Sequence, residues 1–226
     1  IPFIDPSKCT YCRKCVEYCE FNAIVVIPPA KFAEINSSLC HSCGACQIAC
    51  ESDAIRENDH PIGRITHFKD RIGNGVIEGR LKIGSPMQTM VIRSLKRSVP
   101  DGKQLILRDA PPGTSCPVVE TISDADFVIL VTEPTPFGLS DLKLMIQLVR
   151  EIEKPFGVVV NKANLGNRDI YQFLESEGIE LLTEIPFNRA YASQYAKAEL
   201  FSEIPEEIQL AYAKLLHTLS LKKLVV

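Results

Sequence analysis

The stretches Cys9-Thr-Tyr-Cys12-Arg-Lys-Cys15-Val-Glu-Tyr-Cys19 and Cys40-His-Ser-Cys43-Gly-Ala-Cys46-Gln-Ile-Ala-Cys50 decide the fold of the amino-terminal part of the chain. They hold eight of the nine cysteines, and the intervals between the cysteines are the same in both runs. Three thiols at positions i, i+3 and i+6 of a tight loop can surround one centre, but a fourth must come from elsewhere in the chain. The sequence therefore predicts two sites, each built from four thiolates.

This spacing resembles that of bacterial-type ferredoxins, in which two runs hold two [4Fe-4S] clusters and the last cysteine of each run ligates the other cluster. A repeat supports such a pseudo-twofold unit, because the segment from Cys19 to Ile24 aligns with the segment from Cys50 to Ile55. Glutamate replaces the usual proline after the fourth cysteine in both halves, which we expect to loosen the turn without removing a ligand. The resemblance implies a small α+β ferredoxin domain over residues 1–60 with two ligand sets: Cys9, Cys12, Cys15 and Cys50, and Cys19, Cys40, Cys43 and Cys46.

Two other uses of these cysteines compete with this interpretation. Paired Cys-x2-Cys motifs can bind structural zinc, and many cysteines in a short secreted chain can form a disulfide framework. Two full runs of four favour iron-sulfur, since zinc needs only four cysteines at two paired spacings. We expect no signal peptide and a reducing compartment, the cytoplasm. His41 is expected to be a surface residue or a neighbour of the ligands, because the cysteine set is complete without it.

The composition is that of a soluble globular chain, with 46% hydrophobic and 23% charged residues and a net charge of −3. No apolar run approaches the roughly 18 residues that a membrane span requires, so we expect no stable membrane insertion, and nothing in the composition points to nucleic acid. Residues 1–60 contain eight acidic and five basic residues. This acidity suits docking to a basic redox partner protein, although solvation of a small domain accounts for the same charges.

A second domain is predicted over residues 61–226, where long apolar runs alternate with amphipathic stretches. The runs 104–109, 126–132 and 156–161 are nearly continuous in aliphatic residues, which is typical of strands buried on both faces of a parallel sheet. Strands alternating with helices indicate an α/β fold with a mostly parallel sheet and flanking helices. We expect helices at 88–98, 139–152, 168–177, 189–198 and 205–220, and a short strand at 180–185.

Polar residues follow the predicted strands at the edge where α/β proteins bind ligands. Asp109 ends one run and is followed by two prolines and Gly113, an arrangement in which the acid can hold a Mg²⁺ water shell and the glycine amide can face a phosphate. An aspartate that caps a turn before proline is the alternative. The segment 131–142 leaves its strand through two prolines, and Asn161 ends the next run, where its amide can pair with a purine edge.

These signatures together resemble the MinD/ParA-type P-loop ATPases that contain an inserted ferredoxin domain. The resemblance covers essentially the whole chain and rests on the cysteine runs, Asp109-Ala-Pro-Pro-Gly-Thr-Ser-Cys-Pro117, Thr132-Glu-Pro-Thr-Pro-Phe-Gly-Leu139, Asn161-Lys162 and Ile185-Pro186-Phe187. It implies MgATP as a second cofactor. Asp109 would be the catalytic Walker B acid that acts on Mg²⁺ and Gly113 the switch glycine. Asn161 would contact adenine, with Pro186 and Phe187 flanking the base.

The chain departs from that family in one large respect. No G-x-x-x-x-G-K-[ST] motif occurs, and the glycine-containing segments 72–76 and 79–81 lack its Gly-Lys-Ser/Thr end. In the family, the P-loop part precedes the ferredoxin module. We therefore expect the chain to be a fragment, with a degenerate ATPase half as the alternative, and the resemblance alone leaves ATPase activity undecided.

The function that follows is an iron-sulfur protein coupled to ATP. The ferredoxin module passes electrons or senses redox state, while the nucleotide controls dimerisation of MinD-like subunits, as a homo- or heterodimer, or partner docking. The alternatives are a cluster carrier or scaffold ATPase, and a plain ferredoxin with a vestigial ATPase domain. Cys116 is expected to be a loop residue, with a thiol that modulates the switch or bridges a cluster across a dimer as alternatives. Residues 205–226 are expected to form a packing helix rather than a membrane-targeting tail.

Overall fold

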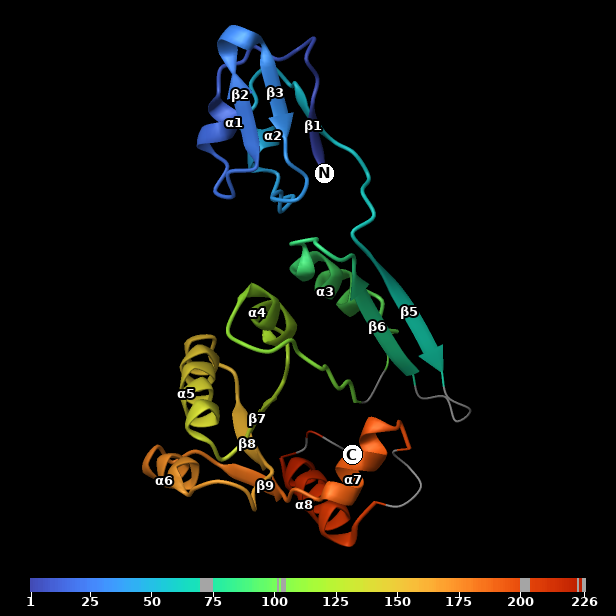
Figure 1. Ribbon diagram of the computed structural model, residues 1–226, viewed down its shortest axis with the longest axis vertical. Coiled ribbons are helices and arrows are strands. Elements are labelled where there is room, and N and C mark those ends of the chain that lie inside the picture. The colour runs from blue at the N-terminus through green and yellow to red at the C-terminus, as the bar shows by residue number, and fades with distance from the viewer. Residues whose placement is uncertain (70–74, 101, 103–104, 200–203, 223, 225–226) are drawn as a thin grey trace. The chain divides into compact units, whose positions relative to one another are not determined.

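The computed structural model describes residues 1–69, 75–100, 102, 105–199, 204–222 and 224. Its internal contacts divide the chain into two compact units, Ile1–Val99 and Pro100–Val226 (Figure 1). The first unit includes residues 61–99, which the sequence pattern assigns to the second domain. The described residues of this stretch, 61–69 and 75–99, form a hairpin and a helix and add no strand to the parallel sheet of the second unit.

The cysteine-rich part of the first unit consists of two antiparallel strand pairs and two short helices. Its elements are β1 (Pro2–Ile4), α1 (Lys14–Glu17), β2 (Ile24–Ile27), the 3₁₀ turn η1 (Pro28–Ala30), β3 (Phe32–Ile35), α2 (Ala45–Ile48) and β4 (Ile55–Glu57). Strand β1 pairs with β4, and β2 pairs with β3. Ile24, Val26, Cys46 and Ile55 form its small buried core.

The two halves of this part repeat with an offset of 31 residues. Helix α1 begins at Lys14 and α2 at Ala45. A backbone bond from Asp5 N to Ala54 O has its counterpart from Asn36 N to Ala23 O, both 2.7 Å long. Each strand pair joins one strand from each half, so the halves exchange strands as well as cysteines. The pseudo-twofold unit expected from the sequence repeat is thus visible in the backbone.

Residues 63–69 and 75–97 add a hairpin and one helix. Strand β5 (Gly63–Lys69) pairs antiparallel with β6 (Gly75–Leu81), and α3 (Gln88–Arg97) packs on both. Gly79 permits this packing, since a Cβ there would lie 3.0 Å from the side chain of Val91. Gly75 and Gly79, from the glycine-containing segments 72–76 and 79–81, therefore lie in strand β6. Residues 72–74 of the first segment lie outside the described residues.

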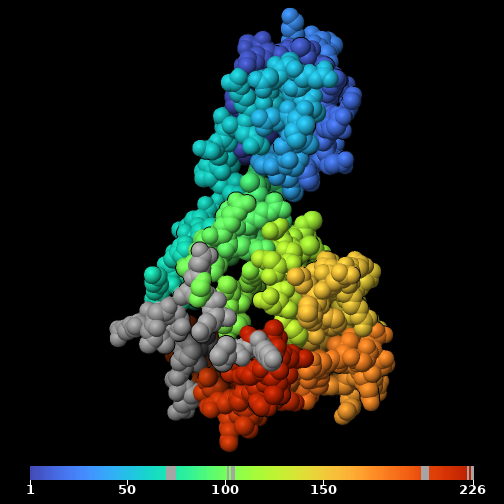
Figure 2. Space-filling view, turned by 180° about the vertical axis from the view of Figure 1, so that it is seen from behind, coloured from blue at the N-terminus to red at the C-terminus, as the bar shows by residue number. Residues whose placement is uncertain are grey.

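The second unit is an α/β fold around a three-stranded parallel sheet in the order β7-β8-β9. The predicted strands at 126–132, 156–161 and 180–185 and the predicted helices are confirmed within a few residues. Helices α5 and α6 pack against each other (Figures 1 and 2). The elements are α4 (Cys116–Ile122), β7 (Val128–Thr132), α5 (Pro136–Glu151), β8 (Phe156–Asn161), α6 (Asp169–Ser176), β9 (Leu181–Ile185), α7 (Arg189–Ala196) and α8 (Glu206–Leu221).

Helices cover both faces of this sheet because side chains alternate along each strand. Val158 and Val160 lie in the core cluster that includes residues of α4, α5 and α6. Val159 points to the other face, where its neighbour Thr183 donates its hydroxyl to the carbonyl of Ala211 in α8 at 3.0 Å. The expected packing of the carboxyl-terminal helix is confirmed for Glu206–Leu221, while residues 223, 225 and 226 lie outside the described residues. No helix among the described residues is both long and apolar enough to cross a membrane.

The predicted strand at 104–109 is wrong for residues 105–109, which pair with no strand in the described part of the chain; Gln104 lies outside it. A strand needs a neighbour to satisfy its backbone groups, and β7 is the edge of the sheet on this side. Leu105, Ile106 and Leu107 are exposed. Arg108 instead fixes the segment next to α4, through Asp124 at 2.5 Å and the carbonyl of Thr121 at 3.1 Å.

Candidate metal centres

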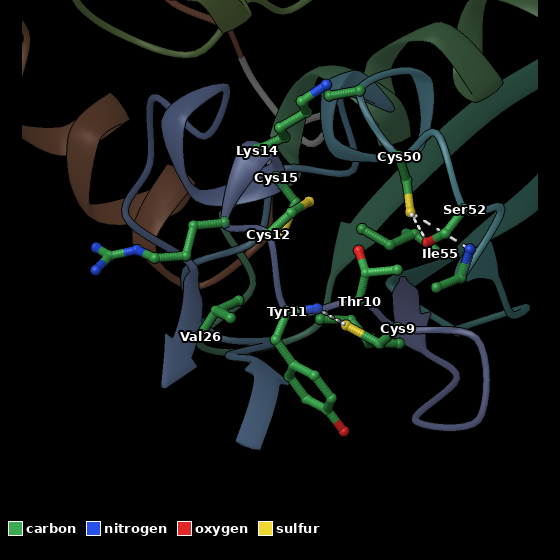
Figure 3. A pocket seen from close by; sticks show the side chains of 14 residues that line it. Cys9, Thr10, Tyr11, Cys12, Lys14, Cys15, Val26, Cys50, Ser52 and Ile55 are labelled. Atoms are coloured by element: carbon green, nitrogen blue, oxygen red, sulfur yellow. Dashed lines mark hydrogen bonds between the residues drawn. The ribbon is translucent and has the colours of Figure 1, made fainter. Parts of the chain in front are cut away.

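Two cavities in the first unit are each lined by four cysteines. Three come from one run and the fourth from the other, as the ferredoxin resemblance implies. Each cavity encloses about 330–340 Å³, open solvent at its mouth included. Figure 3 shows the first cavity, which Cys50 lines together with the three cysteines of the other run. Cys9, Cys12, Cys15 and Cys50 line the first cavity, and Cys19, Cys40, Cys43 and Cys46 line the second.

Backbone amides point at the cysteine sulfurs in matching places of the two halves. Tyr11 N lies 3.4 Å from Cys9 Sγ, and Ser42 N lies 3.4 Å from Cys40 Sγ. The left-handed backbone of Tyr11 and Ser42, with φ of 57° and 48°, allows each loop to turn its amide inward. An N–H directed at a sulfur stabilises negative charge on it, so the loops are prepared for thiolate ligands.

The fourth cysteine of each run is held in the same way. Ala23 N donates to Cys19 Sγ at 3.4 Å, and Ala54 N donates to Cys50 Sγ at 3.3 Å. Both bonds span four residues, because each run closes with a turn that leads directly into a strand. The similarity of the two turns shows that glutamate at positions 20 and 51 is compatible with this geometry.

Burial and the neighbouring cysteines raise the pKa of the innermost thiols. Burial, with the neighbouring Cys40 and Cys43, raises the pKa of Cys46 to about 11. Burial raises the pKa of Cys15 as well. Burial also acts upward on the pKa of Cys50, but the Ser52 hydroxyl and nearby backbone amides outweigh it and lower that pKa. Four thiolates in one cavity need a positively charged group among them, and the sulfur-rich, partly enclosed walls fit an iron-sulfur cluster.

The remaining polar groups near the cavities do not complete another kind of site. None of the nine cysteines, all of which lie in the described residues, forms a disulfide. His41 lines the second cavity and stacks on Phe21, with ring centroids 3.8 Å apart. No three cysteine, histidine or acidic side chains in the described ranges converge closely enough to hold a single metal ion.

In the second unit, the structure brings together three of the residues assigned to the nucleotide. Asn161 ends β8 beside Ile185 of β9, and Pro186 and Phe187 follow directly. Asn164, which sequence reasoning missed, joins the two loops: its side chain accepts from Phe187 N at 2.7 Å and donates to Phe187 O at 3.2 Å. An asparagine in a loop carries no sequence signal for this role, because its partner lies 23 residues away.

The loop after β7 is tied to the same edge by an ion pair. Lys162 Nζ lies 2.6 Å from Glu133 Oε1, so the ends of β7 and β8 are linked. Asn167 N also donates to the carbonyl of Pro134 at 3.3 Å. The carboxyl ends of three parallel strands therefore form one connected polar edge.

Asp109 and Gly113 do not lie at the polar edge formed by the carboxyl ends of β7, β8 and β9. Both are exposed and lie in the segment before α4, outside the sheet, and Gly113 has a φ of 90°. No hydrogen bond or ion pair among the described residues joins either of them to the ends of β8 or β9. The expectation that Cys116 lies in a loop is wrong, because this residue is the exposed first residue of α4.

Comparisons with known proteins bear on the cysteine runs and on the α/β fold. Residues 1–51 match the family model described as the 4Fe-4S dicluster domain. This match favours iron-sulfur over structural zinc. The chain also resembles the solved structure of the MinD cell division protein of Aquifex aeolicus, with a TM-score of 0.51 and 18% identity, over 68% of this chain and 67% of that one. That likeness supports the α/β fold alone.

Two curated proteins of Methanocaldococcus jannaschii are similar to the chain in sequence. MJ0579 is 30% identical over 166 residues, which cover 72% of this chain and 56% of that protein. MJ0578 is 30% identical over 210 residues, which cover 92% of this chain and 72% of that protein. The chain thus spans little more than half of the length of MJ0579. Both relatives are described as uncharacterized. On the extent of the second match, the chain belongs to the family of MJ0578.

Proposed function

We propose that the cysteine-rich part of this protein transfers electrons through two [4Fe-4S] clusters. The observation that carries the proposal is the crossed arrangement, in which each cavity takes three cysteines from one run and one from the other. Such clusters, when bound, accept and release single electrons. The eight cysteines hold them, the backbone amides stabilise charge on the sulfurs, and the apolar residues behind the thiols exclude water.

The first test is the iron and acid-labile sulfide content of the protein purified without oxygen. We expect about eight iron and eight sulfide per chain, as two cubanes require. Cys12→Ala and Cys43→Ala each remove an exposed thiol with little loss of packing, so each is expected to lose iron and alter the EPR spectrum. Cys116→Ser is the matched control, since this exposed cysteine lies in the other unit. Bound zinc without sulfide would overturn the proposal.

A cluster carrier differs from an electron-transfer protein in whether it keeps its iron. A carrier donates its cluster to an apo-protein within minutes, whereas an electron carrier keeps it through repeated reduction and oxidation. The burial of Cys40 and Cys46 supports retention. Rapid transfer of iron and sulfide to an apo-ferredoxin would favour the carrier.

For the second unit we propose nucleotide binding at the polar edge formed by the carboxyl ends of β7, β8 and β9. The joined loops around Asn161 and Phe187 support it, because open α/β sheets bind ligands outside these strand ends. MgATP held there would control dimerisation or docking of a redox partner protein. The phosphate-binding loop would have to come from outside the 226 residues, which contain none. The many reduced thiols suit a reducing compartment such as the cytoplasm.

Nucleotide binding is tested on the protein as its own cells make it. We expect Asn161→Ala to weaken ATP binding about tenfold, the effect of about 1.4 kcal/mol from a lost hydrogen-bonding pair. Gln147→Ala, which removes an exposed amide on α5, should leave binding unchanged. Sedimentation with and without MgATP measures dimerisation. Absence of ATP binding in the whole protein would make the α/β unit vestigial and leave the ferredoxin function alone.

A further inference from the structure

The 31-residue repeat allows the surroundings of the two cavities to be compared position by position. The cysteines and their backbone amides correspond, but several neighbouring side chains do not. Ser52 lines the first cavity where its counterpart Phe21 lines the second. Thr10 likewise corresponds to His41. The cavities therefore share their ligands and differ in polarity.

Hydroxyl groups and positive charge surround the first cavity. Ser52 Oγ lies 3.5 Å from Cys50 Sγ, in addition to the amide of Ala54 that donates to the same sulfur (Figure 3). Arg13 and Lys14 also line this cavity. Lys14 forms an ion pair with Glu51, which cancels one of the two charges. A hydroxyl donor and one net positive charge both favour additional negative charge among the sulfurs.

The second cavity is more buried and its described lining residues include no lysine or arginine, although Tyr18, His41 and Ser42 contribute polar groups to it. The rings of Phe21 and His41 stack at an interplanar angle of 15°, and both line this cavity. The counterparts of Arg13 and Lys14 are Gly44 and Ala45. Its thiols Cys40 and Cys46 are each 8% exposed, whereas the corresponding Cys9 and Cys15 are half-buried. Low polarity disfavours additional negative charge.

We propose that the two sites have different reduction potentials and that the first cavity holds the electron of the singly reduced protein. This inference rests on the proposed electron-transfer function. The step is the uptake of one electron from an external one-electron reductant, which is oxidised, and no covalent bond forms or breaks. The electron would reside beside Ser52 and Arg13, where the surroundings stabilise negative charge.

An EPR-monitored redox titration of the full protein, with dithionite as reductant, tests the proposal. The wild type should show two one-electron waves. Ser52→Ala should lower the higher midpoint and leave the lower one in place. At fixed potential the ratio of reduced to oxidised sites should fall about threefold to tenfold, the range that one hydrogen bond supplies. Ser52→Thr, which keeps the hydroxyl, should retain the wild-type midpoint.

The pseudo-twofold counterpart provides the reciprocal test. Phe21→Ser places a hydroxyl at the matching position of the second cavity and should raise the lower midpoint only. A single wave, a shift of the lower wave by Ser52→Ala, or no shift by either variant would overturn the assignment. If Phe21→Ser fails to assemble, the pair of Ser52 variants decides alone. Iron and sulfide are measured first. Their absence from the wild type overturns the proposed function. Full iron and sulfide content with the higher midpoint at the second cavity overturns only this inference.

Discussion

Gly138, in the first turn of α5, lies in close contact with the end of β7. A Cβ at this position would collide with the carbonyl oxygen of Glu133 and lie 3.0 Å from Thr132 Oγ1. Alanine favours a helix over glycine by about 1 kcal/mol. Overpacking against a backbone oxygen costs about 1–3 kcal/mol, so the collision should outweigh the propensity.

We therefore expect Gly138→Ala to destabilise the protein, as measured by denaturant unfolding. Gly75→Ala is the control, because its Cβ would lie 3.5 Å from the nearest atom, an ordinary contact. Equal stability of both variants and the wild type would contradict this prediction. It would show that the loop after β7 moves away from the added methyl group at little cost in free energy.

Thr183 gives a second prediction at the same scale. Its side chain is buried and its hydroxyl donates to Ala211 O at 3.0 Å. Thr183→Val removes this bond at nearly constant volume and should cost about 1 kcal/mol. Thr218→Val is the matched control, since Thr218 makes a similar 2.9 Å bond to Lys214 O at the surface. We expect chemical denaturation to separate the two, and an equal loss would contradict the importance of burial.

At the scale of elements, α8 is held to the sheet by a small number of buried side chains. Ile208 is 1% exposed, while Leu210, two residues further along the helix, is 63% exposed. Ile208→Ala should lower the free energy of unfolding by about 2–5 kcal/mol, because it removes buried methyl groups and leaves a cavity. Leu210→Ala should change it by less than about 0.5 kcal/mol. Thermal and denaturant unfolding measure both, and similar losses would mean that α8 packs differently.

At the scale of the whole molecule, the two units depend on different sources of stability. In the described part of the chain, the core cluster of the cysteine-rich part has four buried residues, whereas the main core cluster of the second unit has eleven. Small domains with few buried apolar groups usually need metal or disulfide links to remain folded. The iron would therefore supply a large share of the folding free energy of the first part.

Removal of iron with a chelator under reducing conditions should accordingly unfold the cysteine-rich part and spare the parallel sheet. Hydrogen exchange measures this: amides of β2 and β3 should lose protection, while those of β8 keep it. Retained protection in β2 and β3 would show that the small core suffices without metal. Loss of protection in β8 would show that the units are not independent.

Much of the fold could be predicted from sequence because the decisive patterns are local. The local sequence predicts a helix over the amphipathic segment 139–152 and a strand over the nearly continuous aliphatic run 156–161. Residues 105–107 show the limit, since their apolar run is as strong but finds no strand to pair with. The roles of Asn164 and Ser52 depend on contacts that the sequence does not show. Asn164 joins two loops through Phe187, and Ser52 lies beside the sulfur of Cys50.

By itself, the sequence determined the two cysteine runs and their repeat, because the spacing within each run is short. The grouping of three cysteines from one run with the last cysteine of the other was implied by the ferredoxin resemblance. The sequence likewise determined the order of most helices and strands, whose periodicity is a property of the local chain. Only the tertiary structure decided that the run at 105–107 stays outside the sheet and that the strand-end loops meet through Asn164. It also decided that the two cysteine cavities differ in polarity. These features depend on which distant segments come into contact, and the physical reason is that pairing, burial and hydrogen bonding are satisfied in space rather than along the chain.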